Sequence, residues 1–136
     1  MKRLILDTNV LVRFLVQDDA KQAAAATKLI SDAQFGVYEL LLDRMVVAEL
    51  VYVLMSHYKR AREDVANTVL AIVRSPYVRV EREPELVDSL LRFRDQGVDL
   101  VDAWLAATGA NSRLDVASFD RDFGKFNDVK RHEPKA

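Results

Sequence analysis

The sequence contains no cysteine, only four glycines and three prolines, and no long run of apolar residues. Without cysteine, disulfide frameworks and thiolate metal sites are excluded, and a cytoplasmic location is allowed. No apolar run approaches the roughly 20 residues that span a membrane. The first residues, MKRLILD, reach a charge too early for a signal peptide. We therefore expect neither a membrane protein nor a disulfide-stabilised secreted one.

The sequence also lacks an excess of one charge, with 20 basic and 21 acidic residues and a net charge of −1. A protein that binds nucleic acid through bulk charge would be more basic. This balance disfavours a passive nucleic-acid module but leaves an enzyme with a local acidic site open. With 136 residues, half of them hydrophobic, the chain is predicted to form one domain, residues 1–136, with its own core.

Apolar patterns and helix caps predict strands alternating with helices along the chain. Strands are expected over residues 4–6, 38–42, 77–81 and 116–119, with one short edge strand in the tail from 129 to 136. Helices are expected over residues 9–16, 20–33, 44–57, 62–74, 84–95 and 99–111. This alternation predicts an α/β fold with a short, parallel-rich central sheet flanked by helices. The first strand is continuously apolar and is expected to be buried.

Two of the predicted strands end in an acid, LILD at Asp7 and ASFD at Asp120. In open α/β sheets, ligands bind outside the carboxyl ends of the strands. If the strands are parallel, both carboxylates reach the same edge of the sheet. The alternative is that each acid only ends a strand or caps a helix.

Glu49 lies in MVVAELVYVL, a segment that is apolar on nearly every side of a helix. Such a helix is predicted to be buried. A buried carboxylate is costly unless it is paired or binds a metal. Glu49 is therefore a candidate ligand, and a salt bridge to an arginine of a neighbouring helix is the alternative.

Asp99 and Asp102 lie one helical turn apart in GVDLVDAWLAA and share a helix face. Capping by Asp99 and a first-turn position for Asp102 would explain both without a ligand. Asp102 is the stronger candidate because it precedes the expected packing residues Trp104 and Leu105. Asp43 is best explained as a helix cap. Asp122, in the first turn after Asp120, is kept as a possible peripheral ligand.

Several carboxylates gathered without histidine or cysteine repel one another unless a cation joins them. Hard oxygen ligands select Mg²⁺ or Mn²⁺. Such a site can bind phosphate oxygens, activate a water and stabilise a leaving oxygen, as metal-dependent nucleases do.

Taken together, these motifs resemble those of the PIN-domain ribonucleases, and within them the VapC toxins of type II toxin–antitoxin pairs. The matching features are an apolar strand ending in DTN, a Glu in an apolar helix, D-x-x-D-A in a later helix, and S-F-D after a short strand. The resemblance covers essentially the whole chain. It implies that the catalytic and metal-binding residues are Asp7, Glu49, Asp102 and Asp120. It further implies Asp99 as an additional metal ligand, and Asn9 and Ser118 as supporting residues that hold the first and last acids by hydrogen bonds.

The same resemblance implies cleavage of single-stranded or looped RNA that depends on Mg²⁺ or Mn²⁺ and leaves a 5′-phosphate. It implies a homodimer and a cognate antitoxin protein that covers the site. The sequence departs from the family at Asp43, where small or hydroxyl residues are more usual, and this adds a negative charge. It does not identify the RNA or the dimer interface, nor whether one or two ions bind.

Basic residues near the predicted site are candidates for contacts with RNA phosphates: Arg13, Arg44, Lys59, Arg60 and Arg62. The alternative for each is a solvated surface charge. His57 and His132 have no partner in a metal motif and are predicted to be non-catalytic. The aromatic residues Phe14, Phe35, Phe93 and Trp104 are predicted to be core residues.

Three other hypotheses for the function are considered. A haloacid-dehalogenase-like phosphatase would use Asp7, but its D-x-D-x-[TV] signature fails at Asn9 and Leu11. A receiver-like, Mg²⁺-binding module needs an acid pair after the first strand and a late lysine, and LILDTN and ASFD offer neither. A PIN domain without catalytic activity, kept for protein contacts, is disfavoured by an intact set of acids.

Overall fold

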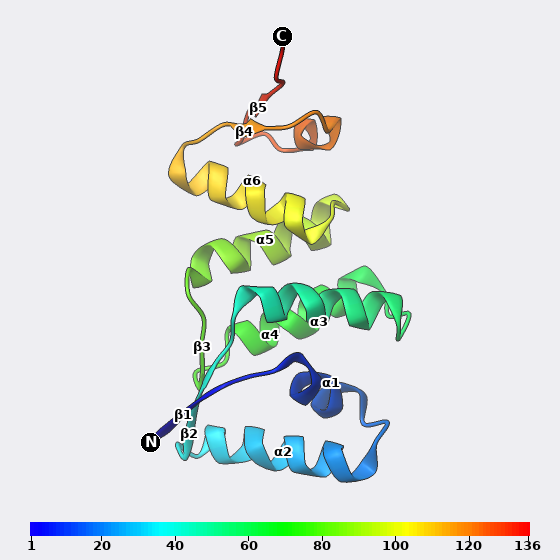
Figure 1. Ribbon diagram of the computed structural model, residues 1–136, viewed down its shortest axis with the longest axis vertical. Coiled ribbons are helices and arrows are strands. Elements are labelled where there is room, and N and C mark those ends of the chain that lie inside the picture. The colour runs from blue at the N-terminus through cyan, green and yellow to red at the C-terminus, as the bar shows by residue number, and fades with distance from the viewer. The chain divides into compact units, whose positions relative to one another are not determined.

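The computed structural model describes all residues, 1–136 (Figure 1). Its internal contacts divide the chain into two compact units, Met1–Glu81 and Arg82–Ala136. Helices accompany parallel strands in both units. The predicted α/β class with parallel strands flanked by helices is therefore confirmed. The single domain over residues 1–136 stays a prediction.

The first unit is a three-stranded parallel sheet with two helices in each crossover. Its elements are, in order, β1 (Lys2–Ile5), α1 (Thr8–Val16), α2 (Ala20–Gln34), β2 (Tyr38–Leu41), α3 (Arg44–Ser56), α4 (Arg62–Val73) and β3 (Val78–Arg79). The strand order is β1-β2-β3, so β2 is central. Parallel pairing needs such long crossovers, which the helices supply.

The core of the first unit lies on one face of β2. Leu40 is fully buried, and the register places it beside Leu4 of β1 and Val78 of β3. Glu39 points to the opposite face, where its carboxylate pairs with Arg3 at 3.0 Å and Arg79 at 3.2 Å. The alternation of the strand therefore separates an apolar face from a charged one.

Carboxylate caps begin α2 and α3, and the cap at Asp43 was predicted. The Asp19 carboxylate accepts a hydrogen bond from the Gln22 amide at 3.0 Å and begins α2. The Asp43 carboxylate accepts one from the Met45 amide at 2.7 Å and begins α3. Gly36, with a φ of 85°, follows α2 in the left-handed region that ends helices.

The second unit packs two helices together and adds a small parallel sheet. Its elements are α5 (Glu83–Gln96), α6 (Leu100–Ser112), β4 (Val116–Ala117), the 3₁₀ helix η1 (Arg121–Lys125) and β5 (Arg131–His132). β4 and β5 pair in parallel, which confirms the predicted short strand in the tail. Gly97, with a φ of 66°, ends α5.

Gly109 lets the C-terminal segment approach α6 closely. A Cβ at this position would lie 2.7 Å from Cγ2 of Val129 and 2.8 Å from the carbonyl oxygen of Leu114. No alanine fits there without a shift of the backbone at Leu114. The glycine therefore allows the segment after η1 to pack on the helix that carries Asp102.

Several burial predictions were wrong. Ile5 is 79% exposed because β1 is an edge strand and only alternate side chains reach the packed face. Phe35 is 85% exposed because it lies beyond the last turn of α2, and Leu105 is 42% exposed on α6. Phe93 is buried as predicted. Trp104 is half-buried, with the Arg82 guanidinium 5.0 Å from its ring centroid.

Candidate active site

Asp7 lies directly after the first strand, at the carboxyl edge of the sheet. The ladder continues one residue beyond β1, since the Leu6 amide donates to the Leu41 carbonyl at 2.9 Å. Asp7 then begins α1, and its Oδ1 accepts a hydrogen bond from the Thr8 amide at 2.8 Å. Asn9 makes no hydrogen bond to Asp7, so the contact predicted from Asn9 is absent and the backbone of Thr8 orients the carboxylate instead.

Asp43 occupies the equivalent place on the neighbouring strand. The register pairs Ile5 with Leu41, and Asp7 and Asp43 each follow two residues later. Both carboxylates are exposed and both cap a helix. The parallel sheet thus brings Asp7 and Asp43 to one edge. Asp120 follows β4, which pairs with β5 in a separate two-stranded sheet, so the expected meeting of Asp7 and Asp120 at one sheet edge is not confirmed.

Glu49 is exposed on α3, so the prediction of a buried carboxylate was wrong. Met45 and Tyr52, four residues before and three after it on the same side of the helix, are 78% and 69% exposed. The helix packs through another side, formed by Val47, Leu50, Val51 and Leu54. The apolar sequence did not reveal which side packs. The candidacy of Glu49 therefore rests on the family resemblance and not on the cost of burial.

In the second unit, α6 carries Asp99 and Asp102. Asp99 is the N-cap residue, but its side chain makes no capping hydrogen bond. The predicted capping role is therefore confirmed in position only. Asp102 lies in the first turn and is half-buried, whereas Asp99 is exposed. An acid at a helix N-cap that does not cap its helix has carboxylate oxygens available for another ligand.

Asp120 follows β4 and is held on both sides by local hydrogen bonds. Its amide donates to Oγ of Ser118 at 2.9 Å, and its Oδ1 accepts from the Asp122 amide at 2.9 Å. The first bond is the kind of contact predicted for Ser118. The carboxylate of Asp122 lies 3.6 Å from Nζ of Lys125. The ASFDRD segment thus fixes the orientation of Asp120 through short-range contacts.

The carboxylates of the second unit influence one another. Burial raises the pKa of Asp102, and the negative charges of Asp120, Asp99 and Asp122 raise it further. Both causes disfavour the ionised form of Asp102. A cation held among these acids would reverse the repulsion.

We expect Asp102→Asn to raise the melting temperature in the presence of chelator. Because the folded pKa of Asp102 is raised above its ordinary value of 3.8, its ionisation destabilises the native state as the pH rises through that raised pKa. The variant should match the wild type at pH 3 and be more stable at pH 7. Melting curves over this range measure the difference, with Asp115→Asn, at an exposed position after α6, as the control. An equal stability gain at both pH values would contradict the expectation.

Neither unit alone gathers three acidic or histidine side chains into a ready metal-binding group. The donors themselves fit a hard divalent cation, since all are carboxylates and the anion of Asp102 is disfavoured by burial and by its acidic neighbours. Of the candidates, Asp7 and Glu49 belong to the first unit, and Asp99, Asp102 and Asp120 to the second.

The basic candidates differ in their surroundings. Arg13 donates to Asp18 through Nη1 and to Gln22 through Nε, both at 2.8 Å, so it ties α1 to the start of α2. The hydrogen bond with Asp18 raises the pKa of Arg13. Arg44 and Lys59 are exposed, whereas Arg60 and Arg62 are half-buried. Arg13 thus has a structural role, whereas the side chain of Lys59 is exposed to solvent.

An open groove of about 380 Å³ lies where the three strands of the first unit end. Three arginines line it: Arg3, Arg44 and Arg79. Glu39 pairs with Arg3 and Arg79, and Arg44, which follows Asp43, is the one lining residue among the candidates for phosphate contacts. The sequence did not reveal this groove, because its lining comes from three separate strand ends.

Comparison with known proteins identifies the class to which this fold and these acids belong. The profile of the PIN domain matches residues 4–129, and the chain therefore belongs to the PIN domain family. It is also similar to the VapC ribonuclease of Aquifex aeolicus (strain VF5), with 28% identity over 132 residues, which cover 95% of this chain and 97% of that protein. The predicted likeness to PIN domains of the VapC type is confirmed.

These comparisons lend no support to the phosphatase and receiver-like alternatives. No helix of the structure combines the length and the apolar character needed to cross a membrane. The roles of the individual site residues stay predictions.

Proposed function

We propose that this protein is a metal-dependent endoribonuclease and the toxin of a type II toxin–antitoxin pair. Membership of the PIN domain family and similarity to a VapC ribonuclease support a nuclease that hydrolyses phosphodiester bonds. The observation that carries the proposal for this chain is the acidic neighbourhood of Asp102. Burial raises the pKa of its carboxyl, and the negative charges of Asp120, Asp99 and Asp122 raise it further.

We assign the catalytic and metal-binding roles to Asp7, Glu49, Asp102 and Asp120, with Asp99 as a further ligand. A bound Mg²⁺ or Mn²⁺ would supply a Lewis acid that lowers the pKa of a water and neutralises charge on the scissile phosphate. The carboxylates would hold the ion through their oxygens. The amides of Thr8 and Asp122 orient Asp7 and Asp120, and Ser118 holds the Asp120 backbone. Asn9 remains a proposed supporting residue for Asp7.

Cleavage of RNA tests this proposal. The purified chain is incubated with a 5′-labelled, partly single-stranded RNA, with Mg²⁺ or Mn²⁺ and with excess chelator. We expect cleavage with either ion, none in chelator, recovery when the ion is restored, and products with 5′-phosphate ends. Cleavage that persists in chelator would contradict metal dependence. An intact RNA under every condition would instead favour a PIN domain kept for protein contacts.

The toxin role adds partners to the proposal: an RNA substrate in the cytoplasm, a homodimeric state, and an antitoxin protein that blocks the active site. Arg13, Arg44, Lys59, Arg60 and Arg62 are proposed phosphate contacts. Induced expression in a bacterial host tests the role. We expect growth to stop with the wild type and to continue with Asp7→Asn. Growth should recover when the wild type is expressed together with the protein that the adjacent gene encodes. Unaffected growth with active enzyme across several hosts would contradict toxicity.

A further inference from the structure

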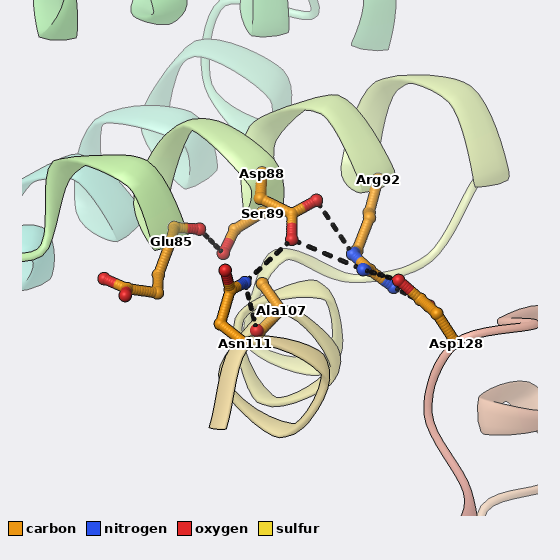
Figure 2. A network of polar contacts seen from close by, with 7 residues as sticks. All are labelled: Glu85, Asp88, Ser89, Arg92, Ala107, Asn111 and Asp128. Carbon is orange, nitrogen blue, oxygen red and sulfur yellow. Dashed lines mark hydrogen bonds and ion pairs between the residues drawn. The ribbon is translucent and has the colours of Figure 1, made fainter. Parts of the chain in front are cut away.

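Arg92 joins three segments of the second unit through one network of charges (Figure 2). From α5, its guanidinium donates through Nε to Oδ1 of Asp88 at 3.0 Å. It also donates through Nη1 to Oδ1 of Asp128 at 2.8 Å, and through Nη2 to Oδ2 of the same residue. Asp88 in turn accepts a hydrogen bond from Nδ2 of Asn111 on α6 at 3.2 Å. The network therefore connects α5, α6 and the segment after η1.

Arg92 is the buried member of this network, whereas the side chains of Asp88 and Asp128 are 32% and 56% exposed. Arg92 is 8% exposed and is the one charged residue of the chain that is buried. Its guanidinium also lies 5.3 Å from the ring centroid of Phe126, a buried residue of the same segment. The hydrogen bond with Asp128 raises the pKa of Arg92 and lowers that of Asp128. A buried guanidinium that keeps its charge depends on its carboxylate partners, and the bidentate contact with Asp128 has a defined geometry.

The segments that Arg92 joins are those that carry the acids. α6 carries Asp102, and the chain from β4 through η1 to β5 carries Asp120. The chain from β4 to β5 contains little regular secondary structure, because β4 and β5 have two residues each and η1 is a single short helix. Its other anchors are the buried side chains of Phe123, Phe126 and Val129. Side-chain contacts thus decide where Asp120 lies relative to Asp102.

We propose that Arg92 is a positioning residue of the nuclease site, which fixes the Asp120 segment against α6 so that Asp102 and Asp120 are held at a spacing that one divalent ion can bridge. This inference rests on the proposed function. It assigns Arg92, Asp88, Asn111 and Asp128 a role toward metal binding although none of them is a ligand. Residues that orient ligands typically affect metal affinity by about 10- to 100-fold.

Thermal stabilisation by Mn²⁺ tests the inference without RNA. The melting temperature of the full chain is measured as a function of Mn²⁺ concentration, which gives the concentration at half-maximal stabilisation. We expect Arg92→Ala and Asp128→Asn to raise this concentration by about tenfold, and Arg92→Lys to raise it less because one charged contact remains. RNA cleavage measured at varied Mn²⁺ should show the same shift, with much of the rate recovered at high Mn²⁺. Asp128→Asn keeps the test decisive if Arg92→Ala does not fold.

Two controls distinguish an effect of Arg92 on Mn²⁺ binding from a general loss of folding stability. Leu90→Ala removes a fully buried side chain from the same helix and should lower the melting temperature while leaving the half-saturating Mn²⁺ concentration within about twofold. Arg94→Ala removes a guanidinium that pairs with the adjacent Asp95 and should change neither quantity much. Wild-type Mn²⁺ dependence in both Arg92→Ala and Asp128→Asn would overturn the inference while the proposed function stands. A wild type that neither binds Mn²⁺ nor cleaves RNA would overturn both.

Discussion

Replacing Asp7 with asparagine is expected to reduce RNA cleavage by about a thousandfold or more. The carboxylate is the candidate ligand at the carboxyl edge of the sheet, and loss of one member of a set that acts as a unit removes most of its catalytic effect. Asparagine is also a good N-cap, so the contact with the Thr8 amide that begins α1 can persist. The variant should therefore fold normally. Initial cleavage rates with Mn²⁺, together with melting curves, measure the two effects.

Asp43→Asn is the matched control for this variant. Asp43 also follows a strand at the same edge and also caps a helix, through its hydrogen bond from the Met45 amide. Asparagine retains that cap. Because Asp43 is interpreted as a cap and not as a ligand, the rate should remain within about threefold of the wild type. Equal losses in both variants would show that charge at this edge matters and not the particular ligand.

Leu40→Ala is expected to lower the free energy of unfolding by about 2–5 kcal/mol, the range for a buried leucine that leaves a cavity. Leu40 is fully buried in the central strand β2, between Leu4 and Val78 of the two neighbouring strands. Both edge strands therefore lose a packing partner. Urea denaturation of the full chain measures the change.

Leu40→Met tests whether the loss comes from the cavity. Methionine keeps nearly the same volume, so the cost should stay below about 1.5 kcal/mol. A loss in Leu40→Ala no larger than in Leu40→Met would contradict the placement of Leu40 at the centre of the sheet.

Local rules predicted the elements well because short-range chemistry determines them. Asp43 caps its helix where the sequence placed it, and Asp99 lies at the N-cap position of α6 as predicted. The predicted ends of the strands were less accurate. The first strand runs over Lys2–Ile5 and not 4–6, because pairing with β2 and not apolar character sets its limits.

Burial could not be predicted where a segment is apolar on several sides. Glu49 lies in such a helix, and only the packing of α3 decides that it is exposed. Phe35 was misjudged for a similar reason, since its aromatic character suggested the core but its position after α2 exposes it. Tertiary contacts, which no local pattern encodes, decide these cases.

The network of Arg92 was missed altogether in the sequence. Its members, Asp88, Arg92, Asn111 and Asp128, lie on three segments, and the only local sign is an arginine between Leu91 and Phe93 on an amphipathic helix. Asp102 and Asp120, in contrast, were candidates from the sequence because each stands in a short motif. Short motifs indicate candidate acids, whereas contacts between distant segments appear only in the structure.

The most direct test of the central claim is the cleavage rate of one RNA by the wild type, Asp7→Asn, Asp102→Asn and the double variant, all with saturating Mn²⁺. If the acids act together as one metal-dependent set, each single variant should lose about a thousandfold or more, and the double variant should lose little beyond either one. Losses that multiply in the double variant would contradict a single set. Wild-type rates in either single variant would contradict the assignment of the nuclease site to these acids.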